Sequence, residues 1–303
     1  MSMELQQLRY FVAVAEHLNF TRAARACGIS QPSLSQQIQK LEGELGQMLF
    51  ERTGRQVRLT DAGRTLQAGA RKILAAVADA QRALKEPDTA GPLRVGAIPT
   101  VAPYLLPEVV RQFRRSYRDS HLLVQEDLTA HVVRDCLADE LDVAVIALPV
   151  ESDGLQWTEL MTEELLVALP SKHPLAEQRK ISPHDLQSEP FIQLDEMHCL
   201  GEQMGSWCRR NDFRPATTCH SAQLLTVQEF VALGQGISLI PEMAMRSDRS
   251  KRRCYRRLSG GGPQRTLVLI WREGRFRSPV FDGLVATFQQ VCAELGQATA
   301  DVA

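Results

Sequence analysis

The first sixty residues constrain the fold most tightly, because their helical patterns follow one another in a fixed order. Apolar residues recur at helical spacing between positions 5 and 15 and predict a first helix. Thr21–Cys27 predicts a short, alanine-rich second helix, and Gly28 allows a tight turn after it. A third helix follows, capped by Ser30 or Gln31. This order predicts a helix-turn-helix, whose second helix enters the major groove of DNA.

The third helix has one apolar and one polar face. Leu34, Ile38 and Leu41 are spaced to face the core, while the opposite face carries uncharged donors and acceptors that suit base edges. A hairpin with a turn at residues 53–54 follows, and its arginines are expected at phosphates or in a minor groove. The residues expected at DNA are Gln31, Pro32, Ser33, Ser35, Gln36, Lys40, Arg52, Arg55 and Arg58.

A heptad pattern predicts a long helix after the hairpin. Its apolar positions are Leu66, Ala70, Ile73, Val77, Ala80 and Leu84. Such a stripe is typical of the seam of a two-helix coiled coil, which here would form between two copies of the chain. The alternative is that the stripe packs on its own chain. We favour dimerisation through Leu66, Ile73, Val77 and Leu84, because operators are commonly read by two-fold dimers. Residues 86–92 then end the helix and predict a hinge.

The remaining two thirds alternate between strand and helix patterns. The strands are expected at 93–98, 122–127, 143–148, 165–169, 191–194, 237–240 and 266–271, and helices at 105–117, 132–138, 226–233 and 280–295. This alternation predicts an α/β domain with a mostly parallel sheet, large enough for two subdomains with a ligand cleft between them. Thr100 and Thr129 follow two of these strands, so their hydroxyls are expected to face that cleft.

Composition excludes several classes of protein. The net charge of -1 gives no global argument for nucleic acid, so the case for DNA is local. Seven scattered cysteines without a CxxC argue against a disulfide framework and a metal site. Neither a signal peptide nor a membrane-spanning apolar run is present, and no motif indicates a cofactor. We therefore expect a soluble, cytoplasmic protein with no metal.

Cys199 and Cys208 form a pair that one continuous helix would keep apart. Leu200, Met204, Trp207 and Cys208 recur at helical spacing, which predicts a short amphipathic helix. Nine residues of helix rise roughly 13 Å, whereas a disulfide needs Cα atoms about 4.4–6.8 Å apart. The bond would require the helix to unwind, which two internal glycines make easier. Cys199 would lie at the helix start, where backbone N–H groups favour a thiolate. This geometry is typical of a redox switch. The alternative interpretation is that both cysteines are packed structural thiols.

The run from Arg246 to Arg257 is strongly basic, and we interpret it as a solvated loop rather than a second contact to nucleic acid. Cys254 lies within this run. Neighbouring arginines are expected to lower the pKa of its thiol, which would make it a competitor of Cys199.

The first sixty residues closely resemble the winged helix-turn-helix of LysR-type transcriptional regulators. The motifs that carry the resemblance are Phe20-Thr21-Arg22-Ala23-Ala24, Ser30-Gln31-Pro32-Ser33-Leu34-Ser35, Leu49-Phe50-Glu51-Arg52, Leu59-Thr60-Asp61-Ala62-Gly63 and Gly234-Gln235-Gly236-Ile237-Ser238-Leu239-Ile240-Pro241. The resemblance implies a winged DNA-binding domain at 1–60, a linker helix and hinge at 61–90, and a periplasmic-binding-protein-like effector domain at 91–303. Subdomain I would comprise about 91–162 and 266–303, and subdomain II about 163–265.

Within that family, the chain is most similar to the OxyR-type sensors of hydrogen peroxide. The motifs are Gly96-Ala97-Ile98-Pro99-Thr100-Val101, Pro103-Tyr104-Leu105-Leu106-Pro107 and His198-Cys199 with Cys208 beyond. The resemblance implies that Cys199 is the peroxidatic thiol and Cys208 the resolving one. It places Thr100, Thr129, His198 and Arg265 at the peroxide pocket. The chain departs from the pattern at Met197, at Gln223-Leu224-Leu225-Thr226 and in its extra thiols Cys219 and Cys254.

The sequence therefore predicts a regulator of oxidative-stress genes that binds promoter DNA and senses hydrogen peroxide through a thiol-disulfide switch. It is expected to form homodimers or homotetramers and to meet RNA polymerase, without touching a membrane. A LysR-type regulator that binds a small organic effector in the cleft is the alternative. An enzyme such as a thiol peroxidase is disfavoured, because its DNA-reading domain would be idle.

Overall fold

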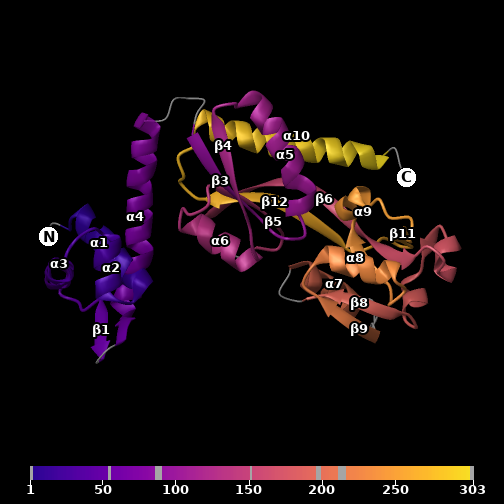
Figure 1. Cartoon of the computed structure of the whole chain (residues 1–303), viewed down its shortest axis with the longest axis horizontal. Helices are drawn as coiled ribbons and strands as arrows, with labels where there is room; N and C mark the ends of the chain where they lie inside the picture. The colour runs from indigo at the N-terminus through magenta and orange to yellow at the C-terminus, as the bar shows by residue number, and fades with distance from the viewer. Residues whose placement is uncertain are drawn as a thin grey trace. The chain divides into compact units, whose positions relative to one another are not determined.

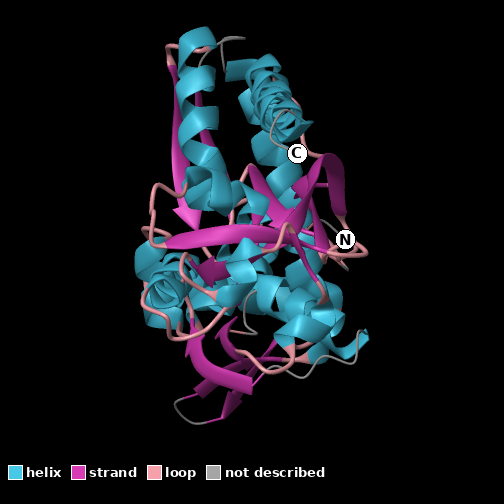
Figure 2. Ribbon diagram, turned by 90° about the vertical axis from the view of Figure 1, so that its right-hand side faces the viewer, coloured by secondary structure: helices cyan, strands magenta, loops and turns pink. Residues whose placement is uncertain are grey.

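The structure is a computed structural model that describes residues 3–53, 56–85, 91–150, 152–195, 199–210 and 216–300. It divides into two compact units. The N-terminal unit comprises residues 1–85 with 274–276, and the effector unit comprises residues 86–273 with 277–303. Figure 2 distinguishes the helices and strands of both units.

The N-terminal unit is a winged helix-turn-helix, as the sequence predicts. Its elements are α1 (Leu5–His17), α2 (Phe20–Ala26), α3 (Gln31–Leu45), β1 (Phe50–Thr53), β2 (Gln56–Leu59) and α4 (Asp61–Lys85). Asn19 caps α2 by accepting from the backbone N–H of Arg22 at 2.9 Å. Ser30, rather than Gln31, caps α3. The apolar face of α3 is buried in the core of this unit, which leaves its polar face exposed.

A buried carboxylate joins the wing to α3. β1 and β2 pair antiparallel, with Phe50 opposite Leu59. Glu42, on α3, is only 5% exposed, and its Oε1 accepts from the backbone N–H groups of Leu49 at 2.8 Å and Phe50 at 3.2 Å. The start of the hairpin is therefore fixed to the recognition helix by charge-assisted hydrogen bonds.

The heptad stripe of α4 changes partners along the helix. Ala70 is fully buried and Leu66 is partly buried, and both pack on the core of the winged unit. Further along, Ile73 is 39% exposed and Val77 is partly exposed, while the side chain of Leu84 lies outside the described part of the chain. The first turns of the stripe thus pack on their own chain. Dimerisation through the later turns stays a prediction.

The effector unit contains two lobes, each around its own core (Figure 1). The first lobe contains β3 (Gly91–Ala97), α5 (Ala102–Ser116), β4 (Ser120–Glu126), α6 (Thr129–Leu137), β5 (Val143–Ala147), β12 (Gln264–Arg272) and α10 (Pro279–Ala300). The second contains η1 (Pro174–Glu177), β7 (Lys180–Ile181), η2 (Pro183–Leu186), β8 (Pro190–Leu194), α7 (Cys199–Arg210), β9 (Ala216–Ser221), α8 (Leu224–Ala232), β10 (Ser238–Pro241), α9 (Glu242–Ser247) and β11 (Arg253–Leu258). β6 (Leu155–Pro170) is long enough to serve both lobes. We call the two clusters of buried residues the first core and the second core.

The main sheet is mixed, so the prediction of a mostly parallel sheet is wrong. Its strand order is β4-β3-β5-β12-β6-β11-β7, and β10 also pairs with β6. β3 is parallel to β4 and β5, because α5 and α6 supply the crossovers between these strands. β12 is antiparallel to both β5 and β6, and β10 and β11 are antiparallel to β6. The chain enters β12 on its return from the second lobe and therefore runs the opposite way.

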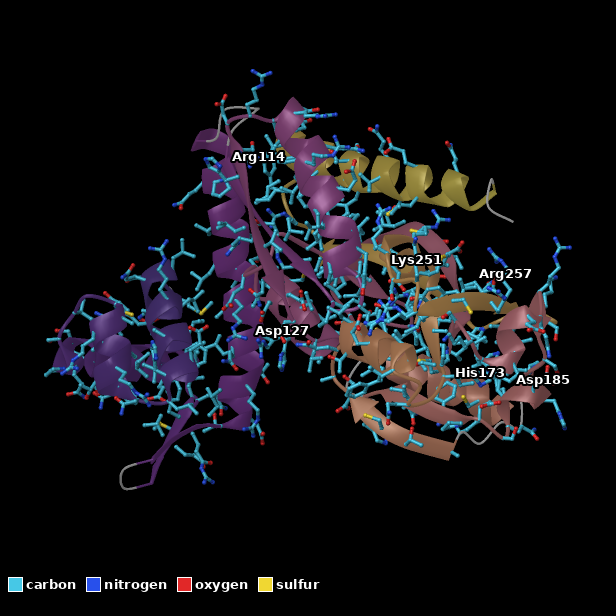
Figure 3. The ribbon with its side chains drawn as sticks, turned by 45° about the vertical axis from the view of Figure 1, so that its right-hand side comes forward. Arg114, Asp127, His173, Asp185, Lys251 and Arg257 are labelled. Carbon is cyan, nitrogen blue, oxygen red and sulfur yellow. The ribbon has the colours of Figure 1, made fainter. Side chains whose placement is uncertain are left out.

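The basic run from Arg246 to Arg257 is a solvated loop only in its middle, and this interpretation is corrected for its two ends. The run comprises the end of α9, a loop at 248–252 with Arg249, Lys251 and Arg252 exposed, and most of β11. The side chain of Arg253 is 4% exposed and pairs with Asp248 and Glu229. Arg257, labelled in Figure 3, pairs with Glu164 on β6. Arg253 and Arg257 are structural, because Glu229 and Glu164 reach them from other elements of the fold, which the local sequence does not show.

Candidate functional site

Cys199 and Cys208 lie on one continuous helix, as the sequence predicts. α7 begins at Cys199 and ends at Arg210, and both thiols are free. Nine residues of helix keep the two Cα atoms roughly 13 Å apart, well beyond the reach of a disulfide. Gly201 has a further role, because a Cβ there would lie 2.5 Å from the backbone oxygen of Asp195. A glycine at this position lets α7 pack closely on the end of β8.

The two thiols belong to different cores. Cys199 is partly buried and packs against the first core. Cys208 is 6% exposed and lies in the second core, beside Met204 and Trp207 on the same helix. Burial raises the pKa of the Cys208 thiol to about 11. At neutral pH Cys208 is therefore a protonated, packed side chain.

A pocket of about 520 Å³ lies beside Cys199. Its described lining residues are Leu148, Pro149, Cys199, Gln203, Ser206, Arg210, Pro263 and Gln264. Gln203 donates from Nε2 to the backbone oxygen of Leu148 at 2.6 Å and so joins α7 to the end of β5. The lining does not include Thr100, Thr129 or Arg265, so the structure does not bring the expected peroxide-pocket residues into this pocket.

Two of those expected residues do contact each other. Arg265, on β12, is fully buried, and its Nη1 donates to Thr100 Oγ1 at 2.8 Å. Its Nε donates to Oε1 of Glu163, which is also fully buried, at 2.8 Å. The second oxygen of Glu163 accepts from the backbone N–H of Met243 at 2.7 Å, at the start of α9. Arg265 thus ties the loop after β3 to β6 and α9. Because Thr100 Oγ1 accepts from a cation, its own O–H group is polarised.

Thr129 begins α6 at the carboxyl end of β4, beside a hydrogen-bonded aspartate–histidine pair. The carboxylate of Asp127, labelled in Figure 3, contacts Nδ1 of His131 at 2.8 Å. Hydrogen bonds from His131 and the backbone of Leu128 lower the pKa of Asp127. This pair fixes the first turn of α6 and the place of Thr129. His198 lies outside the described residues.

The other thiols are packed side chains. Burial raises the pKa of Cys254, although Arg256 partly opposes the shift, so the expectation of a lowered pKa is wrong. Burial likewise raises the pKa of Cys292 to about 12. Cys219 is partly buried, and its Sγ contacts the backbone oxygen of His220 at 3.5 Å.

The face of α3 expected at DNA is open to solvent. Gln31, Pro32, Ser33, Gln36 and Lys40 are exposed, and Ser35 is partly exposed. Ser33 also closes the first turn by contacting the hydroxyl of Ser30 at 2.7 Å. Lys40 lies 3.4 Å from Glu4 across the domain. Arg58 is exposed on β2, whereas Arg55 and the side chain of Arg52 lie outside the described residues.

Among the described residues, no group of His, Cys, Asp and Glu could hold a metal ion. None of the helices described is long and apolar enough to cross a membrane.

Comparison with known proteins agrees with this architecture. Residues 5–64 match the family of bacterial regulatory helix-turn-helix proteins of the lysR type, and residues 87–293 match the LysR substrate binding domain. Two family matches in this order cover most of the chain. The protein therefore belongs to the LysR family of DNA-binding transcriptional regulators.

Within the family, several similar proteins carry the OxyR name. The chain is 36% identical to the "DNA-binding transcriptional dual regulator OxyR" of Escherichia coli K12, covering 90% of each chain. It is equally identical to the "Hydrogen peroxide-inducible genes activator" of Dickeya chrysanthemi, again over 90% of both. Full-length OxyR of Pseudomonas aeruginosa, solved as a cysteine-to-aspartate variant, superposes with a TM-score of 0.77 at 32% identity and 95% coverage of both chains.

Sequence reasoning missed the groups that hold the site in place. Glu163 is the partner of Arg265, and Gln203 joins α7 to β5, yet neither stands in a recognisable motif. The signal for Glu163 is a carboxylate in a strand that continues, after Glu164, as the apolar run 165–169, where a charge is unusual unless it is paired. Gln203 gives no comparable signal.

Proposed function

We propose that this protein is a transcriptional regulator of oxidative-stress genes that senses hydrogen peroxide through Cys199 and Cys208. The names of its relatives support peroxide as the signal. The observation that carries the proposal is the placement of both thiols on one helix, each packed against a different core.

The proposed chemistry has two steps. The Cys199 thiolate, at the start of α7, attacks one peroxide oxygen. A sulfur–oxygen bond forms, the O–O bond breaks, and the departing hydroxide takes a proton to become water. Thr100, polarised by Arg265, is the proposed proton donor, and Thr129 and His198 are the other proposed peroxide contacts. Because neither threonine lines the pocket beside Cys199, this part of the proposal rests on the resemblance to peroxide sensors. The thiol of Cys208 then attacks the sulfenic acid of Cys199, releasing a second water and leaving a disulfide.

The second step cannot occur on an intact helix. α7 must unwind, and Cys208 must leave the second core together with Trp207. The remodelled segment is proposed to change how two copies of the chain pack, and hence how the paired α3 helices bind promoter DNA. Dimers through α4, tetramers and contact with RNA polymerase are parts of this proposal, as are the domain boundaries at 60, 90, 162 and 265. No catalytic turnover is required.

Replacing Cys199 by serine tests the proposal. We expect Cys199→Ser to abolish peroxide-dependent transcription from a bound promoter while keeping DNA binding. Cys254→Ser is the matched control, because Cys254 is also a partly buried thiol of the effector unit. Full peroxide response in Cys199→Ser would refute the switch.

A small organic effector in the same pocket is the second candidate. The volume of about 520 Å³ favours it, since a water molecule occupies roughly 30 Å³ in the liquid and hydrogen peroxide is only one oxygen atom larger. In that case a metabolite would change the footprint on DNA, and reduced and oxidised protein would respond alike.

A further inference from the structure

The pocket beside Cys199 is lined by more side chains than a reaction with hydrogen peroxide needs. Cys199, Gln203, Ser206 and Arg210 follow one another along α7 at spacings of four, three and four, so they form one stripe of the helix that faces the pocket. The facing wall is mostly apolar and consists of Leu148, Pro149 and Pro263 with Gln264. The pocket is thus a trough with a thiol at one end and a guanidinium at the other.

Two polar groups in this trough have no partner among the described residues. Within the described ranges, Arg210 has neither an ion-pair nor a hydrogen-bond partner, although most arginines of the effector unit are paired. Oε1 of Gln203 is buried and accepts no hydrogen bond from any described residue, while Nε2 of the same amide is satisfied by Leu148. A buried acceptor without a donor costs about 1–3 kcal/mol, so this oxygen favours a ligand that brings an O–H or N–H group.

The length of the trough limits the ligand. Cys199 and Arg210 are eleven residues apart, which corresponds to roughly 16 Å along the helix axis. Hydrogen peroxide cannot contact both ends. A molecule that does so needs a donor near Cys199, an apolar middle and an anionic end.

We propose that this trough binds an organic hydroperoxide that carries a carboxylate at the far end of an apolar chain. The carboxylate pairs with Arg210, the chain lies on Leu148, Pro149 and Pro263, and the terminal O–H donates to Gln203 Oε1, one helical turn from the Cys199 sulfur. The inference rests on the proposed oxidation of Cys199 and extends its substrate class from hydrogen peroxide to fatty-acid hydroperoxides.

The reaction balances without a further reagent. The Cys199 thiolate attacks the terminal oxygen, which Gln203 holds. A sulfur–oxygen bond forms, the O–O bond breaks, and the alkoxide leaves with the electron pair and takes a proton from water in the open pocket. Cys199 becomes a sulfenic acid, and the hydroperoxide becomes an alcohol. The sulfur is oxidised by two electrons and the peroxide is reduced by two.

Charge reversal at Arg210 tests the inference. The reduced full-length protein would be mixed rapidly with linoleic acid hydroperoxide, with its methyl ester, or with hydrogen peroxide, and the Cys199 sulfenic acid trapped with dimedone. We expect Arg210→Glu to slow oxidation by the acid roughly tenfold, equivalent to about 1.4 kcal/mol, with less than a twofold change for the ester and for hydrogen peroxide. Arg179→Glu, which changes an exposed arginine away from the trough by the same charge, is the control.

Comparing the three oxidants separates the proposed recognition of a carboxylate from the proposed oxidation of Cys199. If Arg210→Glu leaves the rate with the acid unchanged, or slows all three oxidants equally, the trough does not recognise a carboxylate and the inference is overturned, while peroxide sensing stands. If wild-type Cys199 fails to form a sulfenic acid with any of the three oxidants, the proposed function fails as well. A slowing restricted to the acid supports the inference.

Discussion

Gly205 offers the sharpest test of the idea that α7 must unwind before the disulfide forms. It lies in the middle of the segment between the two cysteines. A Cβ at this position would meet only the flexible end of Arg209, at 3.4 Å. Gly205→Ala therefore fits the folded helix and stabilises it by about 1 kcal/mol, the difference in helix propensity between the two residues.

The expected change in the rate of disulfide formation depends on whether α7 unwinds before the disulfide forms. If unwinding precedes disulfide formation, about 1 kcal/mol of added helix stability lowers the unwound population roughly fivefold. Conversion of the Cys199 sulfenic acid to the disulfide should slow by that factor. Formation of the sulfenic acid should keep its rate, because Cys199 attacks peroxide from the intact helix.

The two rates are measured by rapid mixing with hydrogen peroxide, acid quenching and mass analysis of the trapped thiols. Trp207 fluorescence supplies an independent signal of the opening, since Trp207 is buried next to Cys208. Gly69→Ala on α4 is the control, because that glycine is also in mid-helix with open space around it. Equal slowing of both steps, or an unchanged second step, would refute the unwinding argument.

Three further predictions follow from contacts elsewhere. Arg265→Met should destabilise the effector unit by about 3–5 kcal/mol, because it leaves Glu163 charged and buried. The double variant that also carries Glu163→Met should recover most of that loss. Urea unfolding monitored by tryptophan fluorescence measures the stability of both variants. Burial raises the pKa of Cys208 from 9.0 to about 11, so the protonated thiol stabilises the fold fully below pH 9 and this contribution is lost as the pH rises toward 11. Unfolding free energies across that window should therefore fall more steeply for the wild type than for Cys208→Ala, and parallel curves would contradict the argument. If Gln36 contacts a base, Gln36→Ala should reduce discrimination between the operator and its single-base variants by about 1–3 kcal/mol. Binding titrations at one salt concentration measure this difference. An equal loss of affinity for all DNA sequences would place Gln36 at the DNA backbone instead.

The parts of the fold that depend on short-range patterns could be predicted from the sequence. The winged helix-turn-helix and α7 are periodic and capped within a few residues, so the boundary of α2 was misplaced by only one residue at each end. Long-range pairing could not be predicted. The antiparallel entry of β12, and the pairing of Arg253 with Glu229 and of Arg257 with Glu164, depend on where distant segments meet. Local composition suggested a parallel sheet and a solvated loop at those places.

The same distinction applies to the site. The cysteine spacing alone predicts that a continuous helix holds Cys199 and Cys208 too far apart for a disulfide. It does not predict that α7 packs against two cores. Cys199 packs on the first core, while Leu200, Met204, Trp207 and Cys208 fill the second. Each of these larger apolar side chains contributes about 1.5–3 kcal/mol when buried, so withdrawing the helix costs several kcal/mol.

This cost explains how a small oxidant can have a large structural effect. Without oxidation, the open form of α7 is rare, because nothing replaces the lost packing. A covalent bond between Cys199 and Cys208 forbids the closed helix altogether, since the helix holds those atoms too far apart. The proposed disulfide would therefore act by excluding one of two arrangements rather than by adding favourable contacts. Because α7 contacts both lobes of the effector unit, its unwinding would alter the packing of each lobe, so the proposed oxidation of one helix would be felt throughout the effector unit.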